Sequence, residues 1–234
     1  MTQLISVQAT LRAWCTMHGF FRFVGLCMSL ILVPGVSAQA GVGPQAVIHQ
    51  ATDQLYAALQ HECRSRTLRP KSLSLLVDEI LLPHTDFERM SRLVMGKYWK
   101  QSSDSQRQQF VQEFKELLIR TYATAINRVL PEDISYLPER NPGAPDKTVV
   151  RTEVRPEGMA AMPVHYHMYR KNGRWLVYDV RIEGVSLVAN YRSTFAAEIK
   201  ARGVEGLIVT LKKKNEQQMA ATTVNGQTVL AGSC

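Results

Sequence analysis

Residues 162–188 read MPVHYHMYRKNGRWLVYDVRIEGVSLV, and this stretch decides the fold because it predicts two strands joined by a turn. On both sides of Asn172 and Gly173, large apolar side chains alternate with polar ones. That period of two is typical of strands with one face buried and the other in water. We therefore expect a β-hairpin with one broad apolar face, which helices from the rest of the chain must cover.

The length of the turn sets which residues face one another. A two-residue loop at 172–173 would pair Met168 with Val177 and mix apolar and polar side chains on each face. A three-residue loop at 171–173, with Gly173 left-handed in a bulge, would gather the large apolar side chains on one face. Because a slip of one residue would expose that whole set to water, we predict the three-residue loop. The pairs that it implies are Arg170 with Arg174, Met168 with Leu176, Tyr166 with Tyr178, Val164 with Val180 and His165 with Asp179.

The first 40 residues have the order of a secretory signal peptide. Arg12 and Arg22 precede a short apolar run at residues 23–33, and an A-x-A motif follows at residues 38–40. The run is too short to span a membrane comfortably, so an uncleaved anchor is the less favoured alternative. Cleavage is expected after Ala40, with cleavage two residues earlier as the runner-up.

Cleavage would leave one domain at residues 41–217 and a tail at residues 218–234. The tail is poor in charge and in large apolar side chains, so it is expected to be disordered. Of the four cysteines, Cys63 and Cys234 would remain. They could form a bridge in an oxidising compartment, but no pattern in the sequence predicts one.

The charge of the chain is moderately basic. The formal net charge of +8 falls to +6 without the predicted signal peptide, which contains two arginines and no acidic residue. Basic residues are scattered along the sequence, and only residues 212–214 form a run. The chain lacks a basic stripe with interleaved aromatics, so no nucleic-acid partner is expected. Loose attraction to anionic lipid headgroups is compatible with this charge.

Helical and strand periodicity together predict an α+β fold. Thr85 with Glu88, and Ser103 with Gln106, follow the capping-box pattern that opens a helix. About six helices are expected, at residues 45–63, 70–81, 85–98, 104–130, 193–202 and 204–217. About four antiparallel strands are expected, at residues 134–137, 147–155 and in the two arms of the hairpin. The helices should cover the one apolar face of the sheet and enclose a pocket.

The helix at 104–130 carries two adjacent apolar rows, which make a stripe wider than one neighbouring element needs. Two interpretations remain open, a helix central to the core and a helix that lines a cavity. In the strand at 147–155, Val150, Thr152 and Val154 share one face, opposite Arg151 and Glu153.

No nucleotide-binding, hydrolase or metalloprotease motif is present in the sequence. His165 and His167 have a spacing that could chelate a metal, but their face also carries Arg151 and Asp179. A solvated outer surface is therefore the favoured interpretation, and neither a metal nor a cofactor is expected. Tyr98, Asp179 and Glu183 are the candidates for acid–base chemistry. Since Asp179 should point to the polar face, away from the pocket, an enzyme is not predicted.

Three stretches resemble the MlaC family, also called toluene-tolerance auxiliary transport proteins. They are FERMSRLVMGKYWKQSSDSQRQQFVQEFKELLIRTYATAIN at 87–127, WLVYDVRIEGVSLV at 175–188 and GVEGLIVTLK at 203–212. The resemblance implies a monomeric periplasmic carrier of phospholipid that maintains outer-membrane lipid asymmetry. Its implied partners are an outer-membrane lipoprotein complex and an inner-membrane ABC transporter with an MCE-domain ring. The long tail and the short turn at 172–173 depart from the family pattern.

The resemblance and the residue types together suggest which side chains contact the acyl chains. They are apolar or aromatic residues of the sheet face and of the helices that should cover it. The expected lipid-binding residues are Met90, Val94, Tyr98, Leu118, Tyr122, Val150, Val154, Val164, Tyr166, Met168, Tyr178, Val180 and Ile182. A small-molecule enzyme or binding module with a cone-shaped α+β pocket is the alternative, and a lipid-free adaptor is a third class.

Overall fold

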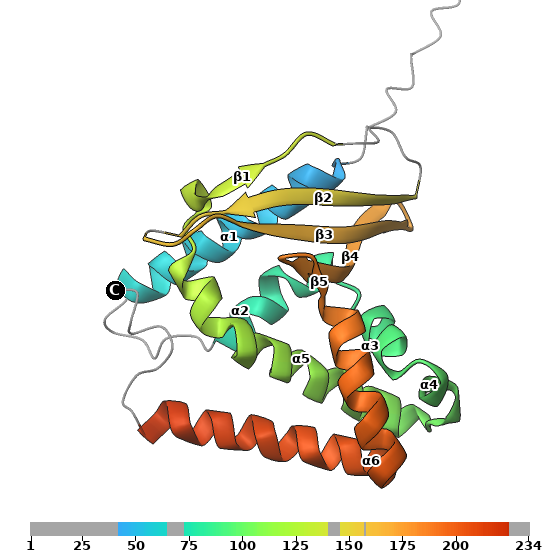
Figure 1. The fold of residues 1–234 in the computed structure, drawn as a ribbon. Coiled ribbons are helices and arrows are strands. Elements are labelled where there is room, and N and C mark those ends of the chain that lie inside the picture. The colour runs from blue at the N-terminus through green and yellow to red at the C-terminus, as the bar shows by residue number, and fades with distance from the viewer. Residues whose placement is uncertain (1–41, 65–72, 140–145, 157, 225–234) are drawn as a thin grey trace, which may run out of the picture. The chain divides into compact units, whose positions relative to one another are not determined.

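The computed structural model of the protein describes residues 42–64, 73–139, 146–156 and 158–224. These residues form an α+β fold with a five-stranded antiparallel sheet in the order β1-β2-β3-β4-β5 (Figure 1). The predicted fold class is confirmed, with one more strand than expected. The predicted signal peptide at 1–40 and the last part of the tail, 225–234, lie outside the described residues.

The strands form a meander in which each strand pairs with the next one along the chain. Their bounds are β1 Ile134–Tyr136, β2 Lys147–Val154, β3 Met162–Lys171, β4 Arg174–Ile182 and β5 Val185–Ser186. The fifth strand was not predicted, because two residues are too few to show any periodicity. It pairs with the end of β4 through a turn in which Glu183 and Gly184 both have positive φ, 51° and 83°.

The turn between β3 and β4 has two residues, so the predicted three-residue loop is wrong. Lys171 pairs with Arg174 across it. Asn172 has φ 51° and Gly173 has φ 78°. Two successive positive φ values are what a two-residue hairpin turn of the right twist requires, and Asn-Gly is the favoured pair for it.

With this short turn and a regular register, polar side chains of β4 would lie on the apolar face of the sheet. A β-bulge in β4 prevents this. Met168 pairs with Val177, but His167 pairs with Asp179, so Tyr178 is an extra residue without a partner in the register. Beyond the bulge Tyr166 faces Val180, whereas Tyr178 was the partner expected for it.

The remaining predicted pairs shift in the same way. Val164 pairs with Ile182 and not with Val180, and His165 pairs with Arg181 and not with Asp179. The ring of Tyr178 lies against the ring of Tyr169, 5.8 Å away between centroids, on the face opposite to Met168.

Helices make up most of the remaining described chain. Their bounds are α1 Pro44–Arg64, α2 Leu73–Ile80, η1 Leu82–His84, α3 Phe87–Met95, α4 Lys97–Gln101, α5 Asp104–Arg128, η2 Pro131–Asp133 and α6 Leu187–Val224. No helix in the described ranges has both the length and the apolar character needed to cross a bilayer.

Helix ends follow the predicted caps in part. Ser103 accepts a hydrogen bond from the Gln106 amide, and the Gln106 side chain accepts one from the Ser103 amide, so this capping box is confirmed. At α3 the cap is Asp86 and not Thr85, because the Asp86 carboxylate accepts from the amide of Arg89 at 2.8 Å.

Helix α6 contains the break that the sequence predicted at Gly203, where φ is 73° and ψ is 176°. Only glycine adopts that conformation readily. The helix begins at Leu187, before the predicted start at Ser193, and runs past the predicted end at Gln217 to Val224.

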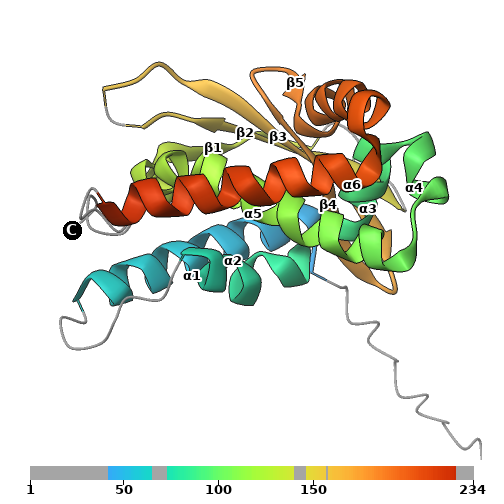
Figure 2. The same ribbon diagram turned by 90° about the horizontal axis from the view of Figure 1, so that it is seen from below.

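The elements pack as a sheet flanked by helices (Figures 1 and 2). Helix α1 packs against β2, and α2 packs between α1 and α5. Helices α3 and α6 contact β4, and α6 also packs along α3 and α5. Thr85, just before α3, forms a parallel bridge with Val177, so the start of α3 is attached to the edge of β4.

Three clusters of apolar side chains result among the described residues: a small one of Val77 and Ile119, and two larger ones that we name by their elements. The sheet cluster consists of Val47, Ile48, Val150, Met168, Trp175 and Val177, with Tyr136, Tyr166 and Val180 partly buried around it. The helix cluster, from α3 to α6, consists of Met90, Val94, Met95, Trp99, Phe110, Phe114, Leu117, Leu118, Val188, Phe195, Ile199, Leu207, Ile208 and Leu211.

Candidate functional site

The sheet cluster lies between α1 and one face of β2, β3 and β4. Val150 and Met168, from adjacent strands, are almost fully buried at 2% and 0% exposed. Val47 and Ile48 cover them from α1. Tyr166 and Val180 face each other across the β3–β4 pair, and both keep part of their surface accessible. The face is therefore largely apolar, and part of it is accessible.

Hydroxyl groups are the polar component of this face. Burial, and then the neighbouring Tyr136, raise the pKa of Tyr166 to about 12, against a smaller opposing effect of a hydrogen bond with Thr152. Thr152 is fully buried and donates a hydrogen bond to the backbone oxygen of Val164 at 2.8 Å. Both tyrosines are neutral at physiological pH, so they bring hydrogen-bonding capacity to the sheet face without charge.

Tyr136 connects these hydroxyls to helix α1. Its ring lies 5.1 Å from the ring of His49, measured between centroids. Burial raises the pKa of Tyr136, and Asp53 raises it further, while a hydrogen bond with Thr52 lowers it. His49 in turn contacts Asp53 at 2.7 Å. The end of the sheet face near β1 therefore has a polar border on α1.

The helix cluster is centred on packed aromatic rings. Phe110 and Phe114, both 0% exposed, stack with ring centroids 5.6 Å apart. Phe195 of α6 meets both rings edge-on, at 5.9 and 6.0 Å. Such offset and perpendicular arrangements are the favourable ones for aromatic rings. This cluster holds α5 and α6 together.

Tyrosine side chains lie at the margin of the helix cluster. Tyr98 and Tyr122 are partly buried against it. Burial, followed by the nearby hydroxyl of Tyr191, raises the pKa of Tyr122. These side chains give the margin of the cluster an amphipathic character.

The structure divides the predicted lipid-binding residues between these regions. Those from helices belong to or pack against the helix cluster, and these are Met90, Val94, Tyr98, Leu118 and Tyr122. Those that belong to or pack against the sheet cluster are Val150, Tyr166, Met168 and Val180. Val154, Val164 and Ile182 lie further along the same sheet face, outside both clusters. The buried contacts do not join the helix group and the sheet group into one core.

Tyr178 is the predicted residue that the structure places elsewhere. The bulge turns it to the opposite face, where the guanidinium of Arg89 lies over the Tyr178 ring at 4.8 Å and over the Tyr169 ring at 3.9 Å. Conversely, Trp175 and Val177 belong to the sheet cluster, although the predicted register put them on the outer face. The two-residue loop at 172–173, which we did not predict, pairs Met168 with Val177 and would have placed both side chains on this face.

Of the three candidate acid–base residues, Asp179 has a structural role. Asp179 is 8% exposed, and its carboxylate accepts hydrogen bonds from the Ser186 hydroxyl at 2.7 Å and the Val188 amide at 3.1 Å. It therefore caps the start of α6. Glu183 is exposed in the β4–β5 turn, and Tyr98 packs beneath the ammonium group of Lys97 at 5.1 Å.

The two histidines of β3 face different partners from those expected. His165 pairs with Arg151 and Arg181, while His167 pairs with Asp179. Burial, then Arg181 and His165, lower the pKa of His167, against an opposing effect of Asp179. Within the residues that the structure describes, no group of three or more His, Cys, Asp or Glu side chains could hold a metal ion.

Asp86 connects α3 to the outer face of the sheet. Besides the Arg89 amide, its carboxylate accepts a hydrogen bond from the Tyr169 hydroxyl and lies 3.7 Å from the Lys171 ammonium. Burial raises the pKa of Asp86, but these hydrogen bonds and the cations Lys171 and Arg89 outweigh it. The pKa therefore lies below its ordinary value of 3.8.

Comparisons with known proteins agree with this architecture. The intermembrane phospholipid transport system binding protein MlaC of Haemophilus influenzae is 27% identical over 184 residues, 77% of this chain and 86% of that protein. The toluene tolerance protein ttg2D of Pseudomonas putida is 24% identical over 180 residues, 76% of this chain and 83% of that protein.

A solved structure has the same fold. It is the phospholipid-binding protein of Ralstonia solanacearum in complex with a phospholipid, with a TM-score of 0.66 and 32% identity. The match covers 75% of this chain and 98% of that chain. The family described as MlaC protein matches residues 49–213, which is more than half of the sequence. The chain therefore belongs to the MlaC family.

Proposed function

We propose that this protein is a periplasmic phospholipid carrier, which holds acyl chains against the sheet face and shuttles lipid between membranes. The name of the Haemophilus influenzae relative and the lipid complex of the Ralstonia solanacearum protein motivate the proposal. The partners that we propose are an outer-membrane lipoprotein complex and an inner-membrane ABC transporter with an MCE-domain ring. Transport between them would maintain outer-membrane lipid asymmetry.

The physical requirement for such a carrier is an apolar interior without inward charge. Two acyl chains contain on the order of 30 methylene groups, and each costs about 0.8 kcal/mol in water. The free energy of the acyl chains in the carrier must be close to their free energy in the bilayer, because tighter binding to the carrier would prevent release. The sheet face meets this description, since its polar groups are neutral hydroxyls.

The observation that carries the proposal is the environment of Tyr166. Burial is the largest cause that raises its pKa to about 12, as expected for a hydroxyl surrounded by protein. Part of the Tyr166 side chain nevertheless remains accessible. A side chain in this position can contact a ligand through its accessible part while its hydroxyl stays shielded from water. We infer that acyl chains pack against the accessible part of Tyr166.

The lining that we propose combines the sheet face with members of the helix cluster and the two tyrosines at its margin. On the sheet it retains the predicted residues except Tyr178, which faces Arg89. Trp175 and Val177 join it because they share the face of Met168. The proposed lining is Met90, Val94, Tyr98, Leu118, Tyr122, Val150, Val154, Val164, Tyr166, Met168, Trp175, Val177, Val180 and Ile182.

The test is organic extraction of the purified protein followed by mass spectrometry. Wild-type protein should release phospholipid in stoichiometric amount. Val180→Glu should abolish lipid content while the protein stays folded, because a carboxylate beside Tyr166 cannot be buried next to hydrocarbon. Val209→Glu is the matched control, since Val209 is 58% exposed on α6 and the same change there should leave lipid content unaltered.

Other outcomes would point to the alternative functions. A small polar metabolite in place of lipid would indicate a binding module or an enzyme. Wild-type protein that releases no bound compound would indicate an adaptor. Unchanged lipid in a folded Val180→Glu variant would remove Val180 from the lining.

A further inference from the structure

Basic residues that are scattered in sequence gather around helix α3, at one end of the described fold (Figure 1). This end consists of the β3–β4 hairpin tip, helices α3 and α4 and the first turns of α6. The tip and helices α3 and α4 lie at the same end in both views (Figures 1 and 2). Arg192 of α6 lies there too, because its guanidinium is next to Gly96, which separates α3 from α4. A Cβ atom added to Gly96 would lie 3.2 Å from the Arg192 guanidinium.

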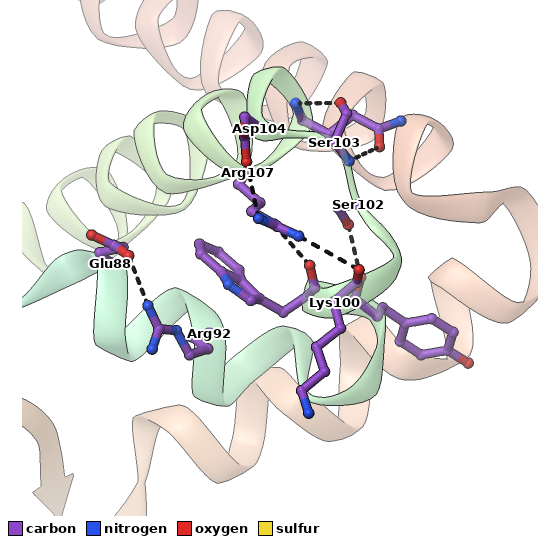
Figure 3. Close-up of polar contacts among 10 residues, drawn as sticks. Glu88, Arg92, Lys100, Ser102, Ser103, Asp104 and Arg107 are labelled. Carbon is purple, nitrogen blue, oxygen red and sulfur yellow. Dashed lines mark hydrogen bonds and ion pairs between the residues drawn. The ribbon is translucent and has the colours of Figure 1, made fainter.

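Most acidic side chains at this end are already engaged. Asp86 is held by Tyr169, Arg89 and Lys171, as described above. Figure 3 shows two further pairs around α3 and α5. Glu88 accepts from Arg92 at 2.8 Å, and Asp104 accepts from Arg107 at 2.9 Å. Asp146, before β2, is exposed.

Several cations at this end remain unneutralised. Exposed basic side chains that have no ion pair with any described residue are Lys97, Lys100, Arg170, Arg174 and Arg192. We call this set the cationic end. In Figure 3 the Lys100 side chain extends away from the surrounding polar contacts. These side chains come from three separate parts of the chain, so the fold and not the sequence creates their proximity.

The cationic end also has an apolar element beside it. Leu82 of η1 is 42% exposed, and η1 packs against β4. His84 follows two residues later and lies near Arg174. Burial lowers the pKa of His84, and the charge of Arg174 lowers it further. Exposed cations beside an exposed leucine are the combination that favours the surface of an anionic bilayer.

We propose that the cationic end binds the headgroup surface of an anionic phospholipid bilayer. This function is distinct from acyl-chain binding at the sheet face, because it brings the carrier to a membrane without extracting lipid. Long, mobile side chains from several elements suit a diffuse layer of phosphates better than they suit one rigid acidic site. For this reason we favour a lipid surface over an acidic protein.

The test is sedimentation of the purified protein with vesicles at low ionic strength. Wild-type protein should bind vesicles of phosphatidylcholine that contain phosphatidylglycerol and should not bind phosphatidylcholine alone. Each basic residue near an anionic surface contributes about fivefold in partitioning. Lys97→Glu/Lys100→Glu should therefore lower binding by about 25-fold or more. Arg170→Glu/Arg174→Glu, at the hairpin tip, provides a second variant if the first fails to fold.

The matched control is Lys212→Glu/Lys213→Glu. Both lysines are exposed on the second arm of α6, and the change in net charge is identical. Retained binding in this variant, with loss in the other, would support the proposal. Equal loss in both would mean that net charge alone attracts the protein, and absence of wild-type binding to anionic vesicles would exclude a lipid surface. Either result overturns the proposal. Val180→Glu should keep vesicle binding although it loses bound lipid. Failure of the carrier proposal can therefore be distinguished from failure of the membrane-binding proposal.

Discussion

The helix cluster and the sheet cluster are both apolar, but they differ in how their side chains are arranged. In the helix cluster, aromatic rings from α5 and α6 contact one another on several sides, and Phe110 and Phe114 have no accessible surface. Beside the sheet cluster, Tyr166 and Val180 retain accessible surface in the middle of a strand pair. The first region is centred on stacked aromatic rings, and the second has accessible side chains along a sheet face.

This difference suggests a division of labour between stability and binding. Complete packing of the helix cluster should supply much of the free energy of folding. The accessible side chains beside the sheet cluster are those that we propose the acyl chains contact. Three changes test this comparison, one inside the helix cluster and two at the links between the helices and the sheet.

Phe114→Ala should have the largest effect. It removes a ring that contacts Phe110, Tyr191 and Phe195, and truncation of a buried Phe costs about 3–5 kcal/mol. Urea unfolding followed by circular dichroism would measure the loss, with Val209→Ala as the exposed control. The lipid content of the protein that remains folded should not change. A loss of lipid with little loss of stability would reverse the roles that we assign to the two clusters.

Asp179→Ala should have an intermediate effect, because Asp179 links strand β4 to the start of α6. The substitution removes the acceptor for the Ser186 hydroxyl and the buried Val188 amide. Leaving a buried donor unsatisfied costs about 1–3 kcal/mol. Asp179→Asn keeps one oxygen acceptor and should cost less. If the two variants unfold at the same urea concentration, the hydrogen bonds to α6 do not provide this stability.

Asp86→Asn should have the smallest effect, and it should depend on pH. The folded pKa of Asp86 lies below its ordinary value of 3.8, so the ionised form stabilises the fold above that value. This contribution is lost as the pH falls through the unfolded and then the folded pKa. The variant should therefore be less stable than the wild type at neutral pH, and the difference should shrink below about pH 4. A constant difference across thermal unfolding curves at several acidic pH values would contradict this account.

Local signals in the sequence predicted much of the fold. The capping box of Ser103 and Gln106 and the break at Gly203 depend on neighbours in the chain, so a single sequence contains them. The buried face of Val150, Thr152 and Val154 follows from alternation alone. The resemblance to the MlaC family, carried by longer motifs, was confirmed.

Features that depend on distant contacts were not predicted. The bulge at Tyr178 changes which side chains share a face, and alternation cannot reveal one extra residue in a strand. Helix α6 begins earlier than expected because Ser186 caps it, and because Asp179, on β4, holds the Ser186 hydroxyl and the Val188 amide. The cationic end was also missed, since its residues are far apart in sequence. For the candidate site, residue type alone suggested the apolar sheet face. Only the structure showed that the predicted residues divide between the sheet cluster and the helix cluster.

The cationic end has one more consequence, for how the molecule approaches a surface. A body with excess positive charge at one end has a permanent electric dipole moment, and the field of an anionic surface exerts a torque on it before contact. At physiological ionic strength, counter-ions limit that field to about 8 Å, so the rotation occurs only in the last step of approach. Orientation would then be selected during encounter, and added salt should slow arrival more than it shortens residence.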